Sequence, residues 1–305
     1  MQRNSSEHPG AQGAWLVAIR PASLPLALGP VVVGAAMGFA RTGSIPVTLF
    51  CMAVAGALLM QILTNLQNDI GFTDRGGEHI GQRKGLPRAT ARGWLSRQAV
   101  RLAIVLLCGV AVALGLGMVM LRGWPVLAIG SASLVAALAY MGGPKPIAYT
   151  PLGELTAFVF FGLVAVMGTD WLLTDQLSVV SALSAAAIGC LSAAALAVNN
   201  HRDREHDALV GRKTFAVLLG ARASKRLMAA LLACPFIMAL AMAGLQSQVV
   251  FLLPLMLAPA AKQLHWDFCE CPEGVAFNAI LFRVFRLEFR FAVMLAGAAV
   301  LSRVL

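Results

Sequence analysis

The chain has 305 residues, of which 59% are hydrophobic and only 12% are charged. A soluble domain of this length does not need so much apolar surface, so the composition predicts an all-α, polytopic membrane protein. The net charge of +10 is typical of basic loops beside anionic lipid, and we do not expect nucleic acid as a partner. The six cysteines are scattered without zinc or disulfide spacing, so neither framework is predicted.

The N-terminal segment differs in composition from the remainder of the chain. Its first fourteen residues are polar and contain no apolar run, so we expect no cleavable signal peptide. We therefore divide the chain into a polar N-terminal tail, 1–19, and a single transmembrane domain, 20–305.

Nine apolar segments come after the tail. Each is about 20 residues long, the length that crosses a bilayer as an α-helix. The predicted spans are residues 21–40, 46–67, 100–121, 124–141, 152–173, 179–200, 227–244, 249–264 and 287–305.

Lys and Arg are concentrated in the connections after the even-numbered spans. The connections after the first and third spans carry only Arg41 and Arg122. Cytoplasmic loops are enriched in basic residues. We therefore expect the N-terminus and the even-numbered connections to be cytoplasmic, and the C-terminus to face the other side.

The most informative stretch closes the sixth span. In a continuing helix Asn199, Asp203 and Asp207 fall at i, i+4 and i+8, nearly on one face. Carboxylates at the end of a membrane helix are costly unless something pairs with them. Mg²⁺ is usually held by one or two carboxylates together with substrate phosphates. The stretch thus predicts half of a Mg²⁺-diphosphate site; a solvated helix cap is the alternative.

A second stretch, at the end of the second span, has the same character. Asn65 and Asp69 are again four residues apart, with Asn68 beside Asp69, and Asp74 and Glu78 come next. Two spans in different halves of the chain therefore end in Asn and spaced acids, and each leads into a basic loop. The repetition favours one shared site over two independent helix caps.

Basic residues in these loops are candidates for binding phosphate. Guanidinium and ammonium groups can hold the phosphate oxygens that a metal leaves free. We select Arg88 and Lys213; ordinary charge that sets the membrane topology is the alternative.

These motifs resemble those of the UbiA-type intramembrane aromatic prenyltransferases. The similarity covers most of the chain. It rests on R-P-A-S-L-P at 20–25, on 65–69, and on N-H-R-D-R-E-H-D at 200–207 with G-R-K-T at 211–214. The segments 151–154, 160–162 and 166–168 resemble the naphthoate branch of that family in particular.

One position departs from the family pattern. The first motif of the family usually reads N-D-x-x-D, and Phe72 stands where the second Asp is expected. Asp74 and Glu78 are nearby acids that could take its place, and we select Asp74. The departure could also mark a subgroup with another acceptor.

The resemblance implies a fold and a reaction. The fold would be nine transmembrane helices around a central cavity, in the bacterial cytoplasmic membrane with the active site on the cytoplasmic side. The reaction would transfer a polyprenyl group from its diphosphate to an aromatic acceptor, 1,4-dihydroxy-2-naphthoate, with loss of CO₂ and a proton. Membrane lipid would surround the prenyl tail, and Mg²⁺ would be the cofactor, with Asp69, Asp74, Asp203 and Asp207 as ligands.

The resemblance also implies roles for individual residues. The catalytic residues would be Asp69, Asp203, Asp207 and Lys213. Two of the substrate-binding residues given next have an alternative role: Tyr149 could be an interfacial aromatic residue, and Glu154 a helix cap. The expected substrate-binding residues are Asn65, Asn68, Arg88, Lys145, Tyr149, Glu154, Asn199 and Arg202.

Other functions remain open at this point. The same chemistry could act on 4-hydroxybenzoate or on a chlorophyll- or tocopherol-type ring. A transporter of an anionic lipid or metabolite is a rival from another class, although no inverted repeat is visible. A catalytically inactive lipid-binding protein is a third, for which Phe72 is the only argument.

Overall fold

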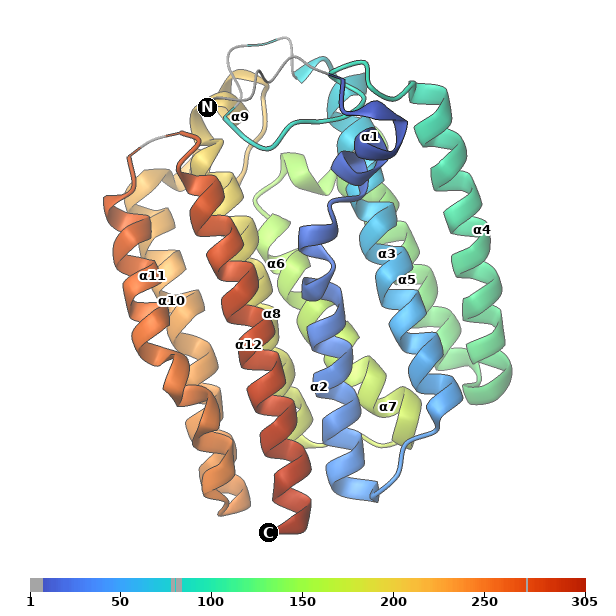
Figure 1. Ribbon diagram of the computed structural model, residues 1–305, viewed down its shortest axis with the longest axis vertical. Coiled ribbons are helices and arrows are strands. Elements are labelled where there is room, and N and C mark those ends of the chain that lie inside the picture. The colour runs from blue at the N-terminus through green and yellow to red at the C-terminus, as the bar shows by residue number, and fades with distance from the viewer. Residues whose placement is uncertain (1–7, 78–79, 81–83, 273) are drawn as a thin grey trace.

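The computed structural model describes residues 8–77, 80, 84–272 and 274–305. In this part of the chain every regular element is a helix, which confirms the predicted all-α fold. The long helices lie side by side in one bundle (Figure 1). Their bounds are α1 Gly10–Ile19, η1 Pro21–Ser23, α2 Pro25–Thr42, α3 Val47–Asp74, α4 Arg97–Arg122, α5 Trp124–Met141, η3 Ile147–Tyr149, α6 Gly153–Ala157, η4 Phe158–Met167, α7 Gly168–Thr174, α8 Val179–Arg202, α9 Arg204–Leu209, α10 Phe215–Gln246, η5 Val249–Leu257, α11 Ala258–Glu270 and α12 Phe277–Val304.

Eight helical segments of the described residues are long and apolar enough to cross a membrane. They coincide with the first eight predicted spans. The ninth, α12, is 28 residues long and runs the length of the bundle (Figure 1). It is not apolar enough to count with these eight, because four charged residues interrupt its hydrophobic run: Arg283, Arg286, Glu288 and Arg290.

Two helices begin well before the predicted starts of their spans. Helix α12 begins at Phe277 rather than at residue 287. Helix α10 begins at Phe215, but its backbone is not helical at Gly220 (φ 78°), so the helix through the predicted span 227–244 is continuous only from residue 221. Basic residues in the early turns of both helices made these turns look unlike an apolar span: Arg222, Lys225 and Arg226 in α10, and Arg283 and Arg286 in α12. The chain thus continues as helix beyond the apolar part of the span.

Part of the predicted polar tail is folded. Helix α1 packs against α3, and its Ala14 and Ala18 are completely buried. Arg20 ends α1 with a left-handed backbone (φ 55°), and the chain then turns through η1 into α2. The N-terminal segment therefore lies against the helix that carries the first acidic motif.

Helix α8 lies at the centre of the bundle and carries the second motif at its end. It packs very closely against η4, a π-helical stretch. A Cβ atom at Gly162 would lie 2.5 Å from the Ala185 carbonyl oxygen and 2.7 Å from the Gly189 Cα. Small residues at such a crossing let membrane helices approach closely.

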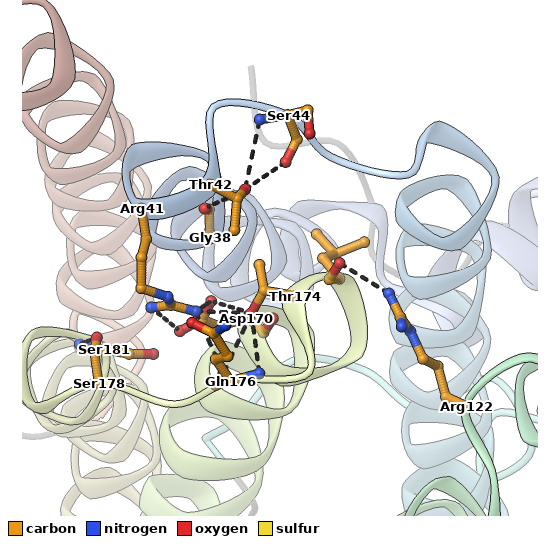
Figure 2. A network of polar contacts seen from close by, with 11 residues as sticks. Gly38, Arg41, Thr42, Ser44, Arg122, Asp170, Thr174, Gln176, Ser178 and Ser181 are labelled. Carbon is orange, nitrogen blue, oxygen red and sulfur yellow. Dashed lines mark hydrogen bonds and ion pairs between the residues drawn. The ribbon is translucent and has the colours of Figure 1, made fainter.

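We call the end of the bundle where α3 and α8 finish the motif end; it is uppermost in Figure 1, beside α9. The opposite end, which we call the far end, is closed by a polar network (Figure 2). Arg41 Nη2 donates to Asp170 Oδ1 at 2.8 Å and to Thr174 Oγ1 at 2.7 Å. Arg122 donates to two main-chain carbonyl groups near the end of α7, at 2.7 and 3.0 Å. The network joins α2 and α4 to α7.

Candidate active site

A cavity of about 750 Å³ lies within the bundle. This is the size of a pocket for a small molecule or cofactor. Most of its wall is apolar, and Phe160, Phe161, Phe282 and Phe285 contribute rings to it. All the charged residues of its lining lie at the motif end: Arg20, Arg88, Arg202, Asp203 and Arg212.

Arg202 and Asp203 form the centre of this charged rim, at the point where α8 ends. Arg202 donates to both carboxylate oxygens of Asp203, from Nε at 2.9 Å and from Nη2 at 2.7 Å. Its Nη1 donates to Asn278 Oδ1 of α12 at 2.7 Å. A bidentate guanidinium–carboxylate pair fixes orientation as well as distance. The second motif therefore presents a rigid Arg–Asp pair to the cavity.

Asp207 lies one helical turn further on, behind this rim. It is almost fully buried and does not line the cavity. Its Oδ1 accepts a hydrogen bond from Arg212 Nη1 at 2.7 Å, while Oδ2 has no partner among the described residues. Burial raises the pKa of Asp207 above its ordinary value; Arg212 opposes the rise and the charge of Asp203 adds to it.

Arg212 connects this acid to the cavity, because its guanidinium is part of the lining. Besides Asp207 it holds the Ala148 carbonyl oxygen at 2.9 Å from Nε, and its guanidinium carbon lies 5.8 Å from the centre of the Tyr149 ring. Tyr149 is half-buried, and burial raises the pKa of its hydroxyl. Tyr149 thus supports Arg212 from outside the cavity.

The first motif contributes amide groups and Arg88 to the rim. Asn65 lines the cavity and ties α3 to the N-terminal segment, since its Nδ2 donates to the Ile19 carbonyl at 2.7 Å and to Ser23 Oγ at 3.0 Å. Arg88 and Asn68 also line the cavity, and Arg88 Nη1 donates to the Asn68 carbonyl.

The acids of the first motif lie elsewhere. Asp69 is fully buried, outside the cavity lining, and its carboxylate accepts hydrogen bonds from the loop after α3. Asp74 pairs with Arg97 at 3.4 Å and Arg101 at 2.9 Å on α4. The structure therefore does not bring Asp74 to the cavity, because α4 neutralises it on the outside of α3. Glu78, the other acid considered, lies outside the described residues.

Some of the remaining predicted site residues lie at the cavity and others lie outside its lining. Glu154 is buried beside the cavity and accepts from Asn200 Nδ2 at 2.9 Å; Asn200 is part of the lining. Lys145 and Lys213 are exposed and do not line the cavity. The predicted site residues at the cavity are Asn65, Asn68, Arg88, Asn199, Arg202 and Asp203; those outside its lining are Asp69, Asp74, Lys145, Tyr149, Glu154, Asp207 and Lys213.

Arg20, Arg212 and Tyr140 are among the lining residues that the sequence analysis did not select. Arg20 belongs to the R-P opening, whose first residue could have been selected as a cation. Arg212 stood beside the chosen Lys213, and only the fold shows which of the two faces inward. Tyr140 lies within an apolar span, and nothing in its neighbourhood marks it as a site residue.

The fit of a magnesium ion differs between the two motifs. The described residues contain no cluster of three or more His, Cys, Asp or Glu. Asp203 at the rim and the partnerless Oδ2 of Asp207 offer the oxygen ligands that Mg²⁺ takes, and substrate phosphates usually complete its coordination. The second motif therefore fits the ion. Arg202 also holds Asp203, but Asp203 lines the cavity. Asp69 and Asp74 do not fit the ion, because neither lines the cavity and both oxygens of each carboxylate have main-chain or arginine partners.

A bundle of membrane-length helices around a cavity with an apolar body and a charged rim defines an integral membrane protein with an amphipathic binding site. Residues 27–283 match the UbiA prenyltransferase family, and the chain belongs to this family. The match confirms the resemblance drawn from the motifs.

Two curated relatives share one enzyme name. The 1,4-dihydroxy-2-naphthoate octaprenyltransferase of Escherichia coli (strain K12) is 34% identical over 225 residues, which are 72% of each chain. The protein of the same name from Mycobacterium tuberculosis is 35% identical over 224 residues, 72% of this chain and 74% of the relative.

Solved structures agree on the fold. A UbiA homolog from Archaeoglobus fulgidus bound to DMAPP and Mg²⁺ superimposes with a TM-score of 0.66 at 14% identity, over 94% of this chain and 98% of the homolog. A UbiA homolog from Aeropyrum pernix K1 gives a TM-score of 0.66 at 17% identity, over 92% and 98%. At these identities the likeness establishes the fold alone.

Proposed function

We propose that the protein is a Mg²⁺-dependent enzyme that transfers a polyprenyl group from its diphosphate to 1,4-dihydroxy-2-naphthoate. One observation carries the proposal. Four arginines and a single carboxylate line the motif end of the cavity, while the rest of the wall is largely apolar. A polyprenyl diphosphate has the same division, since a highly charged anion is joined to a long hydrocarbon chain.

The charged rim suits the diphosphate. Arg20, Arg88, Arg202 and Arg212 bring planar donor groups to one end of the cavity, and guanidinium groups match the geometry of phosphate oxygens. Among the described residues these four guanidinium groups outnumber the carboxylates of Asp203 and Asp207, so this end of the cavity is basic. The apolar body below them, with rings from Phe282 and Phe285, would take the first isoprene units away from water.

Magnesium would be held by Asp203 and Asp207, with the Asn199 side chain beside them. When bound, the ion neutralises diphosphate charge and makes the group a better leaving group. The two motif-end arginines paired with these acids hold them in place, because Arg202 fixes Asp203 and Arg212 fixes Asp207.

When the ring carbon that carries the carboxylate is the one prenylated, the transfer balances with loss of CO₂ alone, and the proton loss expected from the resemblance is not needed. The C–O bond of the prenyl diphosphate breaks, and its electron pair leaves with the diphosphate. A π pair of the electron-rich ring forms the new C–C bond. The carboxylate departs as CO₂, and the pair of its bond to the ring restores aromaticity. Aromatic faces in the wall would stabilise positive charge that develops on the allylic group, and the largely apolar wall would keep water from intercepting it.

The acceptor would enter beside α6 and α8. Asn199, Asn200 and Tyr140 line the cavity near the rim and offer hydrogen bonds to ring hydroxyl and carboxylate groups. The Asn200 amide is oriented by its bond to Glu154. The names of the curated relatives support naphthoate over other aromatic acids.

The site would face the cytoplasm, in a bacterial cytoplasmic membrane. The connections after α3 and α8 are rich in Lys and Arg, and such loops stay on the cytoplasmic side. Cysteine introduced at Lys84 and at Lys213 should be labelled from the same, cytoplasmic side. Labelling from opposite sides would separate the two motifs and refute a shared site.

The function is tested with purified protein in lipid nanodiscs. The protein is incubated with geranylgeranyl diphosphate, Mg²⁺ and a panel containing 1,4-dihydroxy-2-naphthoate and 4-hydroxybenzoate, and the lipid extract is analysed by mass spectrometry. We expect a prenylated, decarboxylated naphthalene product that disappears with EDTA. Product only from 4-hydroxybenzoate would reassign the acceptor. No product, together with uptake of the diphosphate into proteoliposomes, would support a transporter.

A further inference from the structure

The first acidic motif is built differently from the second, and its acids do not face the cavity. We infer that the first motif of this protein positions Arg88 at the diphosphate instead of binding a metal ion. The inference depends on the proposed function only in that a prenyl diphosphate is the ligand. It concerns which groups hold that ligand at this side of the rim.

Asp69 acts as a clamp on the segment that carries Arg88. Its Oδ2 accepts from the Ala89 main-chain N–H at 2.8 Å, and its Oδ1 accepts from the Thr90 N–H at 2.9 Å and the Thr90 hydroxyl at 2.6 Å. The carboxylate is completely buried. A buried carboxylate with hydrogen-bond donors on both oxygens fixes the position of those donors. The two residues that it fixes come directly after Arg88.

Phe72 supplies the second contact. Its ring is completely buried, and the Arg88 guanidinium carbon lies 4.3 Å from the ring centre. The His206 ring stacks on Phe72 at 5.7 Å with an interplanar angle of 28°, and His206 Nε2 lies 3.0 Å from the Gly77 carbonyl oxygen. An arginine stacks well on an aromatic face and keeps its edge N–H groups for other partners.

Phe72 stands at the position where the family pattern has its second acid. A carboxylate there would add a negative charge beside Arg88, whereas the ring packs on the guanidinium and adds none. The neighbouring backbone is shaped for the ring: a Cβ atom at Gly77 would lie 2.6 Å from Phe72 Cε1. The substitution thus exchanges a possible metal ligand for a platform under a cation.

The clamp and the platform together aim Arg88 into the cavity. Its Nη1 donates to the Asn68 carbonyl at the end of the motif, and its side chain is part of the cavity lining. Positive charge for the diphosphate is then supplied on this side by a guanidinium, and on the other side by the metal that Asp203 and Asp207 would hold. The protein would use a single ion where two acidic motifs suggest two.

The number of bound ions tests the inference without turnover. Mn²⁺ is titrated into the purified full chain with a geranylgeranyl thiodiphosphate, which resists cleavage, and bound Mn²⁺ is counted by electron paramagnetic resonance. We expect a single ion in the wild type and in Asp69→Asn, and loss of that ion in Asp203→Asn. Asp74→Asn is a control that keeps the ion. Two ions in the wild type, with one lost in Asp69→Asn, would overturn the inference.

Kinetics separate positioning from folding. Phe72→Leu removes the ring face, and we expect it to raise the KM for the prenyl diphosphate about tenfold while the Mg²⁺ dependence stays unchanged. Phe72→Tyr keeps the ring face and should restore the wild-type KM to within about twofold. A Phe72→Leu variant that alters the Mg²⁺ dependence and leaves this KM unchanged would contradict the assignment.

The two proposals fail in different ways. A wild type that binds the thiodiphosphate with a single ion and transfers no prenyl group would refute the proposed function and leave this inference intact. A wild type that transfers the prenyl group with two bound ions would refute this inference and leave the proposed function intact. Thermal unfolding of each variant is measured in parallel, and the Tyr variant distinguishes a lost platform from a disturbed core.

Discussion

The two ends of the bundle both contain buried Arg–Asp pairs but use them differently. At the far end Arg41 meets Asp170, which is completely buried, and neither residue lines the cavity (Figure 2). At the motif end Arg202 meets Asp203 at the cavity rim, and three more arginines join them. A balanced pair closes a helix contact, whereas a surplus of one charge beside a cavity prepares the site for a ligand of the opposite charge.

The largest effect on activity is expected at the motif end. Asp203→Asn keeps the shape of the side chain and a hydrogen-bond acceptor for Arg202, but removes the charge that a metal ligand needs. We expect turnover to fall by about 10²–10³, while the protein still folds with a lowered melting temperature, because buried Arg202 loses its ion pair. Prenyl transfer and thermal unfolding of the same preparation check both parts. Near-normal turnover would end the metal-site interpretation, and a collapsed protein would give the residue a structural role.

Substitutions at the far end should lower the stability of the protein and leave turnover unchanged. Arg41→Ala leaves the fully buried Asp170 carboxylate without its ion pair and should cost on the order of 2 kcal/mol. Asp170→Ala should cost less, because Arg41 is partly exposed and keeps its hydrogen bond to Thr174. Replacing both should cost less than the sum, because no lone charge remains. Denaturant unfolding of the four proteins in detergent measures the cycle. Additive costs would show that the contact in Figure 2 contributes no coupling.

Tyr149 probes the support behind the rim. Its ring lies between Arg75 and Arg212, at 5.5 and 5.8 Å from their guanidinium carbons. Tyr149→Ala should lower kcat/KM about tenfold, because Arg212 loses the ring beside it. Tyr149→Phe keeps the ring and should stay within about twofold. Equal losses in both variants would point to the hydroxyl group and to a direct role in binding the acceptor.

The smallest effects are expected for the two exposed lysines. Lys145 and Lys213 lie outside the cavity lining. The main-chain N–H of Lys213, which donates to the Tyr149 carbonyl at 3.0 Å, survives substitution. Lys213→Ala and Lys145→Ala should each change kcat/KM by no more than about twofold. Arg212→Ala is the matched comparison, and a larger loss in Lys213→Ala than in Arg212→Ala would reverse the assignment.

The sequence predicted the features that depend on local pattern. Apolar runs of membrane length located eight spans, and four-residue spacing placed Asn199 and Asp203 together at the end of α8. The sequence was a poorer guide to helix starts where charged residues interrupt the apolar pattern. The basic residues in the early turns of α10 and α12 hid the true starts of those helices, although a helix can carry such residues at a membrane boundary.

The orientation of individual acids depends on partners far along the chain. Asp69 and Asp74 were both predicted as metal ligands, but Asp69 accepts hydrogen bonds from the Ala89 and Thr90 backbone and Asp74 pairs with arginines of α4. Neither partner could be identified from spacing, because both depend on how the loop after α3 folds back. The same reason separates Arg212 from Lys213, adjacent residues of which only the first lines the cavity.

A structure of the protein with geranylgeranyl thiodiphosphate and Mg²⁺ would test the difference between the two ends most directly. We expect the diphosphate at the motif end, within hydrogen-bonding distance of Arg202 and Arg88, and the hydrocarbon chain along Phe282 and Phe285. The Arg41–Asp170 pair should remain closed. Diphosphate bound at the far end, or outside the cavity, would contradict the account.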